Sequence, residues 1–252
     1  MKKLIFLYIQ SALLLSVVLS CKKELNQQAT ASLTVVNAMA GSNLVLVNFD
    51  PGFSPAKDPI SGMFSRYRSF DPGARLTIPI KEQFMKVFKY PLLNTQDQSV
   101  YQYHFTPAAG DASTLFLSGT VQQPESVLIT KLPPYHAVAD SVLGLRFVNL
   151  APAKTPVRIR ITGEGTNLTV ANLAYQAATE YLTVNADAKV GNVLVEVFDQ
   201  ASGTLLQTYT LTDVGTTTLE KNIWRYRNYT LAWLPNDLNG NLAAAPFLIE
   251  DF

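Results

Sequence analysis

Apolar and polar residues alternate along most of the chain after residue 30. Val157, Ile159 and Ile161 alternate with Arg158 and Arg160, so one face of this segment is apolar and the other meets water. The same alternation recurs at 101–105 and 193–197. A period of two residues predicts half-buried β-strands. Turn signals such as Asp50-Pro51-Gly52 separate the apolar runs, and no convincing long amphipathic helix follows residue 30.

The pattern of strands repeats once along the chain. Leu33-Thr34-Val35-Val36-Asn37 and Leu145-Arg146-Phe147-Val148-Asn149 both read L-x-x-V-N, at an offset of 112 residues. Four further matches follow in the same order: Tyr67 with Tyr175, Leu76-Thr77 with Leu182-Thr183, Val87-Phe88 with Val197-Phe198, and Thr114-Leu115 with Thr230-Leu231. A repeat of this length indicates tandem domains, because solenoid repeats are shorter. Residues 81–90 have some helical spacing, but they align with a strand of the second copy.

These observations predict an all-β fold of two tandem immunoglobulin-like antiparallel β-sandwich domains. We expect domain 1 at residues 31–135 and domain 2 at 141–235. The linker between them begins at Lys131-Leu132-Pro133-Pro134, since neighbouring prolines interrupt strand pairing. Residues 236–252 are expected to form a C-terminal tail whose apolar end, 246–249, docks on a domain. The alternative architecture is a single larger sandwich with exchanged strands.

The first 20 residues have the organisation of a removable secretory signal peptide. Lys2 and Lys3 precede an apolar run at 4–18, which is too short to span a bilayer comfortably, since a membrane helix needs about 20 apolar residues. Val18-Leu19-Ser20-Cys21 then matches a lipobox, in which the cysteine thiol receives diacylglycerol before cleavage. We therefore predict lipidation at Cys21, with residues 21–30 as a lipidated flexible tether. The alternatives are an ordinary signal peptide with a free cysteine and an uncleaved membrane anchor.

Composition narrows the class of protein. Hydrophobic residues make up 48% of the 252 residues and charged ones 15%, which suits a folded core and argues against disorder. Removal of Lys2 and Lys3 takes the formal charge from +1 to −1, and a neutral chain argues against a nucleic-acid partner. Cys21 is the only cysteine, so no intramolecular disulfide forms. Several acyl chains on Cys21 give stable membrane attachment.

The opening strand of the second copy resembles a family of bacterial cell-envelope domains of unknown function, found as tandem immunoglobulin-like sandwiches in surface lipoproteins. The resemblance rests on the motif R-F-V-N-x-x-P at 146–152 and on two following strands at 172–175 and 180–184. The first copy departs from the motif, because Ala40-Gly41 stands where a proline is expected and the segment 50–75 is longer. The resemblance implies an envelope location and supplies no catalytic residues.

We expect the protein to be no enzyme and to need no cofactor or metal. The two histidines, His104 and His136, lie in no catalytic context, and no G-x-S-x-G nucleophile motif occurs. Zinc needs three or four clustered ligands, which two isolated histidines do not supply. Residues 237–241 are faintly similar to a calcium loop, but Leu248 stands where an EF-hand requires glutamate. The scattered carboxylates give no support for a glycosidase.

Aromatic residues are the remaining candidates for contacts with a ligand or partner. Those of the long first-domain loop are Phe53, Phe64, Tyr67 and Phe70, with Arg66 and Arg68 between them. Trp224 and Tyr226 alternate with arginines on an expected strand. Exposed rings beside polar groups stack on sugars or anchor protein partners. The competing interpretation places the same rings in the core.

The leading functional hypothesis is a non-enzymatic cell-envelope lipoprotein used in adhesion, assembly or partner binding. Its lipid on Cys21 would hold it to a membrane, expected to be the outer membrane of a Gram-negative bacterium, facing the periplasm or the surface. A second hypothesis is a glycan-binding accessory of a nutrient-uptake system, with a polysaccharide partner in place of a protein. A third is a fimbria-like subunit, which expects an exchangeable terminal strand near residues 246–252. Solvent exposure of the candidate aromatics discriminates between the first two.

We predict that Cys21→Ala releases or mislocalises the protein while both domains stay folded, because the lipid is the expected membrane attachment. Membrane fractionation and thermal unfolding of the released protein measure the two effects. A Cys21→Ala protein that still fractionates with membranes through the apolar run at 4–18 would contradict lipid anchorage.

Overall fold

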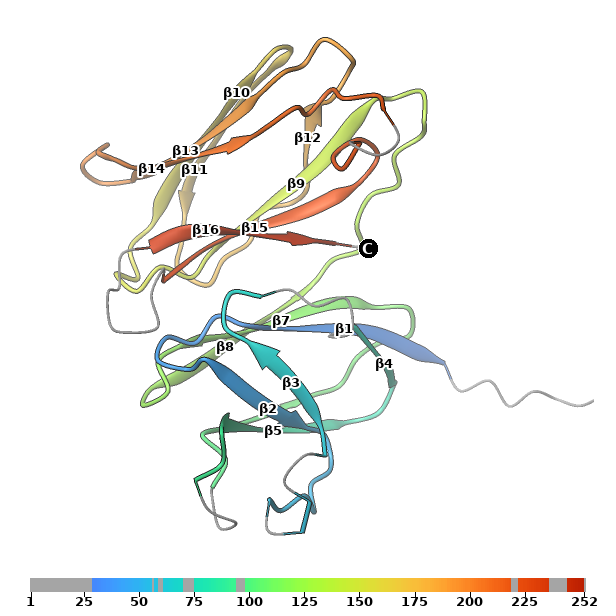
Figure 1. The fold of residues 1–252 in the computed structure, drawn as a ribbon, viewed down its shortest axis with the longest axis vertical. Coiled ribbons are helices and arrows are strands. Elements are labelled where there is room, and N and C mark those ends of the chain that lie inside the picture. The colour runs from blue at the N-terminus through green and yellow to red at the C-terminus, as the bar shows by residue number, and fades with distance from the viewer. Residues whose placement is uncertain are drawn as a thin grey trace, which may run out of the picture.

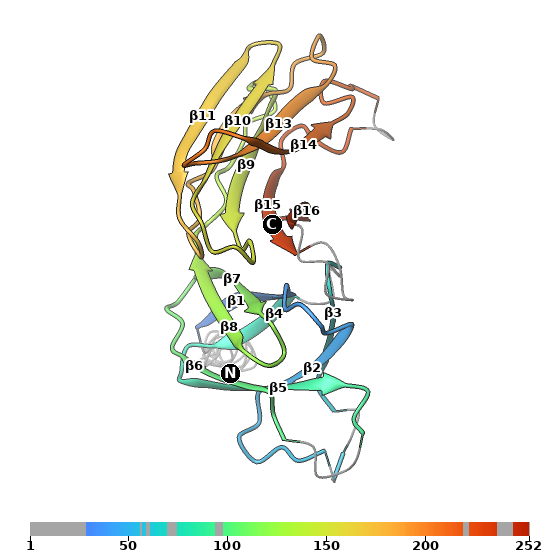
Figure 2. The ribbon, with the colours of Figure 1, turned by 90° about the vertical axis from the view of Figure 1, so that its left-hand side faces the viewer.

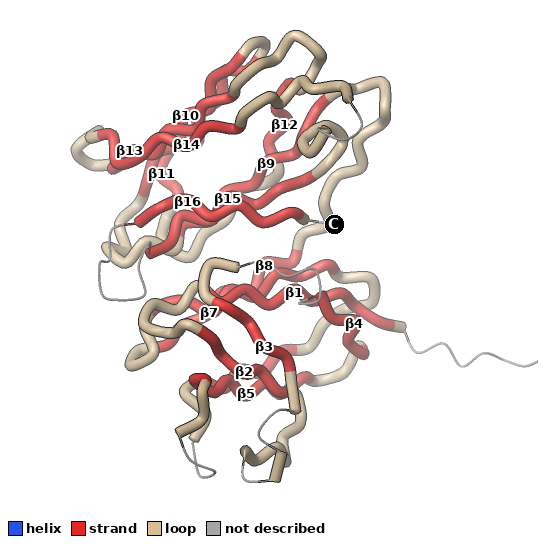
Figure 3. Tube along the Cα trace, viewed as in Figure 1, coloured by secondary structure: helices blue, strands red, loops and turns tan. Residues whose placement is uncertain are grey.

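The regular structure of the protein is β-strand. The computed structural model describes residues 29–55, 57–58, 61–69, 75–93, 98–218, 222–235 and 244–251, and these contain strands and loops only (Figure 3). The predicted signal peptide, Cys21 and Phe70 lie outside the described residues. No described segment is a helix long and apolar enough to cross a bilayer.

In the described part of the chain, sixteen strands form four sheets of four strands each. Those of the first domain are β1 (Thr30–Asn37), β2 (Leu44–Asn48), β3 (Met63–Arg66), β4 (Arg75–Pro79), β5 (Gln83–Tyr90), β6 (Tyr101–Phe105), β7 (Ala112–Gly119) and β8 (Pro124–Thr130). Those of the second are β9 (Val142–Asn149), β10 (Val157–Gly163), β11 (Thr166–Leu173), β12 (Leu182–Asn185), β13 (Val193–Asp199), β14 (Leu205–Leu211), β15 (Asn228–Pro235) and β16 (Ala244–Glu250). The predicted all-β architecture of two tandem sandwiches is therefore confirmed.

The two domains have the same topology. Sheets β4-β1-β7-β8 and β3-β2-β5-β6 enclose the first core, and sheets β12-β9-β15-β16 and β11-β10-β13-β14 enclose the second (Figures 1 and 2). All pairs are antiparallel except β1 with β7 and β9 with β15, which run parallel. These two parallel pairs were not part of the sequence prediction. They arise because the chain crosses to the other sheet and back before it returns beside the first strand.

Strand register makes the duplication visible residue by residue. Leu33 pairs with Leu76, as Leu145 pairs with Leu182. Val47 likewise pairs with Val87, as Ile159 pairs with Val197. The matched positions noted in the sequence therefore occupy equivalent places in the two sandwiches.

The asparagine of the L-x-x-V-N motif joins the two sheets of each sandwich. The Asn37 side chain accepts a hydrogen bond from the Met39 N–H at 3.1 Å and donates to the Ser65 carbonyl at 3.3 Å. Asn149 does the same with Ala151 at 3.1 Å and with Leu173 at 3.0 Å. Both amides are fully buried. Because a buried amide without partners is costly, these bonds explain why both copies keep asparagine at this position.

The segment expected as a C-terminal tail contributes a strand to the second domain. β16 pairs antiparallel with β15 from Ala244 to Glu250 and occupies the position that β8 has in the first domain. Ile249 faces Thr230 as Ile129 faces Thr114. The second sandwich thus extends beyond residue 235, the boundary expected from the sequence.

An apolar interface joins the two domains. The sheets β4-β1-β7-β8 and β12-β9-β15-β16 turn their outer faces toward each other across the middle of the molecule (Figure 1). The buried residues of this interface cluster are Val36, Ala38, Tyr67, Phe116 and Ile129 from domain 1 and Val148, Leu150, Ala232, Leu234 and Ile249 from domain 2. Equivalent positions of the two copies meet here, as in an isologous dimer interface.

Polar contacts at the rim of the interface cluster follow the same symmetry. The Tyr67 hydroxyl of domain 1 donates to the Pro235 carbonyl of domain 2 at 2.5 Å. The equivalent Tyr175 of domain 2 donates to the Glu125 carboxylate of domain 1 at 2.7 Å, and Lys154 forms an ion pair with that carboxylate. These bonds lower the pKa of Glu125, with Lys154 the larger cause. The two domains are therefore held together by polar contacts as well as by the apolar interface cluster.

A buried ion pair fastens the last strand to the sheet that faces domain 1. Arg146 in β9 is 1% exposed, and its guanidinium donates to the Thr230 hydroxyl at 2.9 Å and to the Asp251 carboxylate at 3.3 Å. The Tyr181 hydroxyl donates to the same carboxylate at 2.9 Å, and the guanidinium lies 4.8 Å from the Tyr181 ring centroid. Burial raises the pKa of Asp251 while Arg146 opposes this shift.

We predict that Asp251→Asn lowers the free energy of unfolding by about 3–5 kcal/mol, because it leaves the Arg146 charge buried without a counterion. Urea denaturation measures the loss. The control is Glu250→Gln, which removes the exposed ion pair with Arg227 and should cost less than about 1 kcal/mol. Equal effects of the two variants would mean that the Arg146–Asp251 pair does not stabilise the fold.

Candidate functional site

Two of the aromatic residues predicted as contact sites lie on the outer face of the first domain. Strand alternation in β5 places Met85 and Val87 in the core and directs the intervening side chains outward. Phe64 of β3 packs edge-to-face on Tyr90 of β5, with ring centroids 4.9 Å apart. We define the aromatic face as Phe53, Phe64, Phe84, Phe88 and Tyr90.

The loop after β2 covers the centre of the aromatic face. Phe53 packs edge-to-face on Phe88 at 5.3 Å, and Phe88 is only 3% exposed. The Lys86 ammonium, which lies 5.5 Å from the Phe84 ring centroid, donates to the Pro51 carbonyl at 2.6 Å and so holds the loop in place. Phe64 stays 39% exposed beside this loop. The open part of the face therefore lies along β3 and the end of β5.

The equivalent face of the second domain has a different character. Arg158 and Arg160 stack on the Phe198 ring at 4.7 and 5.3 Å. Arg160 also donates to the Glu196 carboxylate at 2.8 Å, and this bond lowers the pKa of Glu196. A sheet face of paired charges is well solvated. The aromatic face is therefore a property of the first copy and does not follow from the fold.

Tyr67 and Trp224 are buried, which corrects their prediction as contact residues. Tyr67 is 8% exposed and belongs to the interface cluster. Trp224 is 6% exposed, its indole N–H donates to the Thr212 carbonyl at 2.8 Å, and its ring lies 5.0 Å from that of Tyr229 in the second core. The competing interpretation, that these rings serve packing, holds for both. Phe70 lies outside the described residues.

Tyr226 lies in a turn, where the sequence predicted a strand. Its backbone φ of 65° is left-handed, and β15 begins only at Asn228. Such a φ breaks the alternation that the sequence suggested for 224–227. The turn directs Tyr226 into a groove between the domains.

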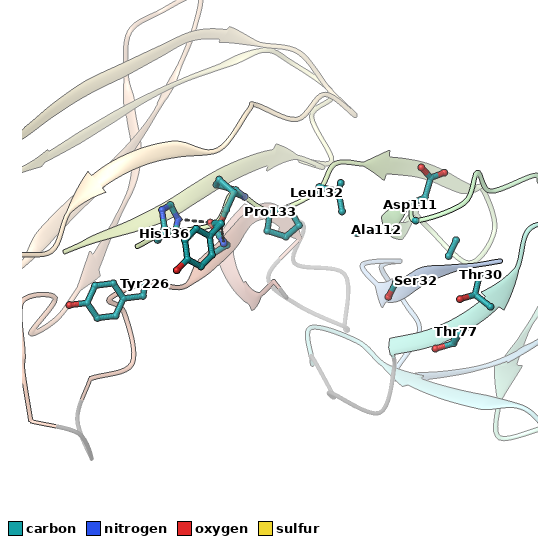
Figure 4. A pocket seen from close by; sticks show the side chains of 14 residues that line it. Thr30, Ser32, Thr77, Asp111, Ala112, Leu132, Pro133, His136 and Tyr226 are labelled. Atoms are coloured by element: carbon teal, nitrogen blue, oxygen red, sulfur yellow. Dashed lines mark hydrogen bonds between the residues drawn. The ribbon is translucent and has the colours of Figure 1, made fainter. Parts of the chain in front are cut away.

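This interdomain groove runs beside the linker and has a volume of about 620 Å³. Figure 4 shows His136 and Tyr226 on one side and Thr30, Ser32, Thr77 and Asp111 on the other, with Leu132 and Pro133 between them. Tyr135, Ala112 and Asn228 also line it. The linker sequence Pro-Pro-Tyr-His was the available signal for this site, but the opposite wall comes from β1, from β4 and from the loop that precedes β7.

A side-chain clamp fixes the linker wall of the groove. The Asn228 amide donates to the Pro134 carbonyl at 2.9 Å, and its oxygen lies 2.9 Å from Nε2 of His136. His136 is partly buried, and Asn228 holds its ring in place. Gly144 makes room for the clamp, since a Cβ there would lie 2.0 Å from the Asn228 amide oxygen. The wall is therefore formed before any ligand arrives.

The described residues contain no group of three or more histidine, cysteine, aspartate or glutamate side chains placed to hold a metal ion. Rings make up the aromatic face, and rings, hydroxyls and an amide line the interdomain groove.

No known family model and no curated protein matches the chain. The similarity of the L-x-x-V-N strands to cell-envelope domains therefore stays a prediction. Solved structures with a related arrangement include family 41 carbohydrate-binding modules from streptococcal virulence factors, described as recognising α-glucan, with a TM-score of 0.26, 9% identity, and coverage of 81% of this chain and 93% of that chain. Another, from Bacteroides uniformis, is described as a candidate cell adhesion protein, with a TM-score of 0.26, 10% identity, and coverage of 88% and 98%. Similarity at this level tells us nothing about ligands.

We predict that Gly144→Ala lowers the free energy of unfolding by about 1–3 kcal/mol, because the new methyl group displaces the Asn228 side chain. Chemical denaturation measures the loss. Gly191→Ala is the control, since a Cβ there has no atom within 4 Å. If Gly144→Ala were as stable as this control, the position of the Asn228 side chain would not depend on the absence of a Cβ at residue 144.

Proposed function

We propose that this chain is a non-enzymatic lipoprotein of the cell envelope that binds a protein partner through the aromatic face of its first domain. The observation that carries the proposal is the difference between the two copies. They share topology and register, but the described outward face of the first copy carries Phe64 and Tyr90, where that of the second carries arginines stacked on Phe198. Since the fold does not require these rings, their presence supports a role in contact.

The composition of the aromatic face suits a protein partner. Phe64 is exposed beside Tyr90, and Arg66 follows Phe64 by two positions on the same outer side of β3. Aromatic and arginine side chains are enriched among the residues that carry most of the binding energy in protein interfaces. The ring pairs and the loop held by Lys86 keep this surface ordered before binding, which reduces the entropy lost on association.

The rest of the molecule fits an anchored binding protein. Cys21 would carry the lipid, and the nine Cα–Cα steps from Cys21 to Thr30 span at most about 30 Å. The aromatic face lies on the same domain as β1, so the length of this tether would set how far from the membrane the face can lie. The location that we propose is the outer membrane of a Gram-negative bacterium, facing the periplasm or the surface.

A glycan partner is the second candidate for the aromatic face, because half-exposed rings such as Phe64 stack on sugars. The fimbria-like alternative has less support. It requires an exchangeable terminal strand, but β16 pairs with β15 along its length, and the residue that follows it, Asp251, is fixed by Arg146.

We predict that a photo-crosslinking residue in place of Arg66 captures a defined protein on intact cells that express the lipidated chain. Phe64→Ala in that background should reduce capture at least tenfold, since a truncated aromatic anchor costs about 2 kcal/mol or more. Mass spectrometry and immunoblotting measure the adduct.

The matched control is Leu194→Ala, at a residue 40% exposed on the equivalent outer face of domain 2, which should leave capture unchanged. Undiminished capture in the Phe64→Ala variant would contradict the proposal. If the chain with Phe64 intact captured no protein but retained a polysaccharide on a glycan array, the result would contradict the protein partner and favour the glycan candidate.

A further inference from the structure

The two sheets that face each other between the domains are apolar at one end and polar at the other. Val36 and Phe116 meet the second domain in the closed part, as members of the interface cluster. Toward the start of β1, the side chains on the face that is turned toward domain 2 are those of Thr30 and Ser32. Thr77 of β4 pairs with Ser32. Hydroxyl groups here replace the apolar contacts. The interdomain groove opens at this polar end.

The linker wall of the groove combines aromatic rings with a backbone that is restrained by prolines. Tyr135 is 89% exposed and follows Pro133 and Pro134, whose φ angles are fixed by their rings. Asn228 ties the Pro134 carbonyl and His136 to β15. Two tyrosines, Tyr135 and Tyr226, thus line the groove from a preformed wall. Preorganisation of this kind lowers the entropic cost of binding.

The charges of the lining exclude some classes of ligand. Among the described residues that line the groove, Asp111 is the single acidic one and none is a lysine or an arginine, so the lining does not favour an anionic ligand. One Asp111 carboxylate oxygen, Oδ2, accepts the Ala108 N–H at 2.8 Å, and the carboxylate keeps further acceptor capacity for donors from a ligand. Hydroxyls of Thr30, Ser32 and Thr77 both donate and accept. This set fits a neutral ligand rich in hydroxyl groups.

We propose that the interdomain groove binds a neutral saccharide. Apolar sugar faces would stack on Tyr135 and Tyr226, while the ring hydroxyls would donate to Asp111 and exchange hydrogen bonds with Ser32 and Thr77. The volume of about 620 Å³ lies within the range of small-molecule sites, about 300–1,000 Å³. The site is separate from the aromatic face, which lies on the opposite sheet of domain 1.

The test uses the full lipidated chain, solubilised in detergent, on an array of neutral and anionic oligosaccharides from bacterial envelopes and from plant and animal sources. We expect retention of neutral members, and the retained set identifies the source of the ligand. Titration with a retained saccharide should show binding at least tenfold weaker for Tyr135→Ala and for Asp111→Asn. Val138→Ala, at a linker residue that is 74% exposed and outside the groove lining, should bind as the wild type does.

Three outcomes would overturn this proposal. One is retention of no neutral saccharide at millimolar concentration, and another is a preference for anionic ones. The third is saccharide binding that Phe64→Ala abolishes while Tyr135→Ala and Asp111→Asn leave it unchanged, because it would place the sugar on the aromatic face. Thermal unfolding of each variant ensures that a loss reflects the groove, since Tyr135 is exposed and its removal should not unfold the chain. The protein-partner proposal stands or falls separately, on capture at Arg66.

Discussion

The packing of the two equivalent sheets against each other determines what the rest of the molecule can do. If the domains were separate, each would expose an apolar face to water. These faces include Val36 and Ile129 of the first domain and Val148 and Ile249 of the second. Packing the two faces together stabilises both sandwiches, because each face removes the apolar surface of the other from water. It also leaves the outer sheets open to solvent, and these point away from each other (Figure 1).

Duplication explains why such an interface could form. Two copies of one fold present the same face, and contacts between equivalent faces come in symmetric pairs. The exchange between Tyr67 and Tyr175 preserves this symmetry even though their acceptors differ, a carbonyl in one case and the Glu125 carboxylate in the other. Divergence then acted on positions that the fold leaves open. Thr34 of the first copy and Arg146 of the second occupy equivalent positions, and the Arg146–Asp251 pair fixes the last strand of the second copy.

Periodicity in the sequence was sufficient for the fold because each strand has one core face. The alternation at 157–161 and the repeated L-x-x-V-N motif predicted strands and duplication, and the observed registers agree. β16 was taken for a tail because its motif is weak, although Leu248-Ile249 repeats the Leu128-Ile129 of β8. The burial of Tyr67 could not be predicted, since it depends on a second domain that covers it. The groove depends on the Asn228–Pro134 bond, between residues 94 positions apart.

A rigid interface has consequences for binding that a flexible linker would not have. In a hinged pair of domains, a ligand between them must close the hinge and lose conformational entropy on doing so. Here the interface cluster is already closed, and Asn228 already holds the linker wall. The groove is thus set by folding, and its shape does not depend on the occupancy of the aromatic face. Two binding surfaces on such a body act independently, unless one ligand changes the stability of the interface itself.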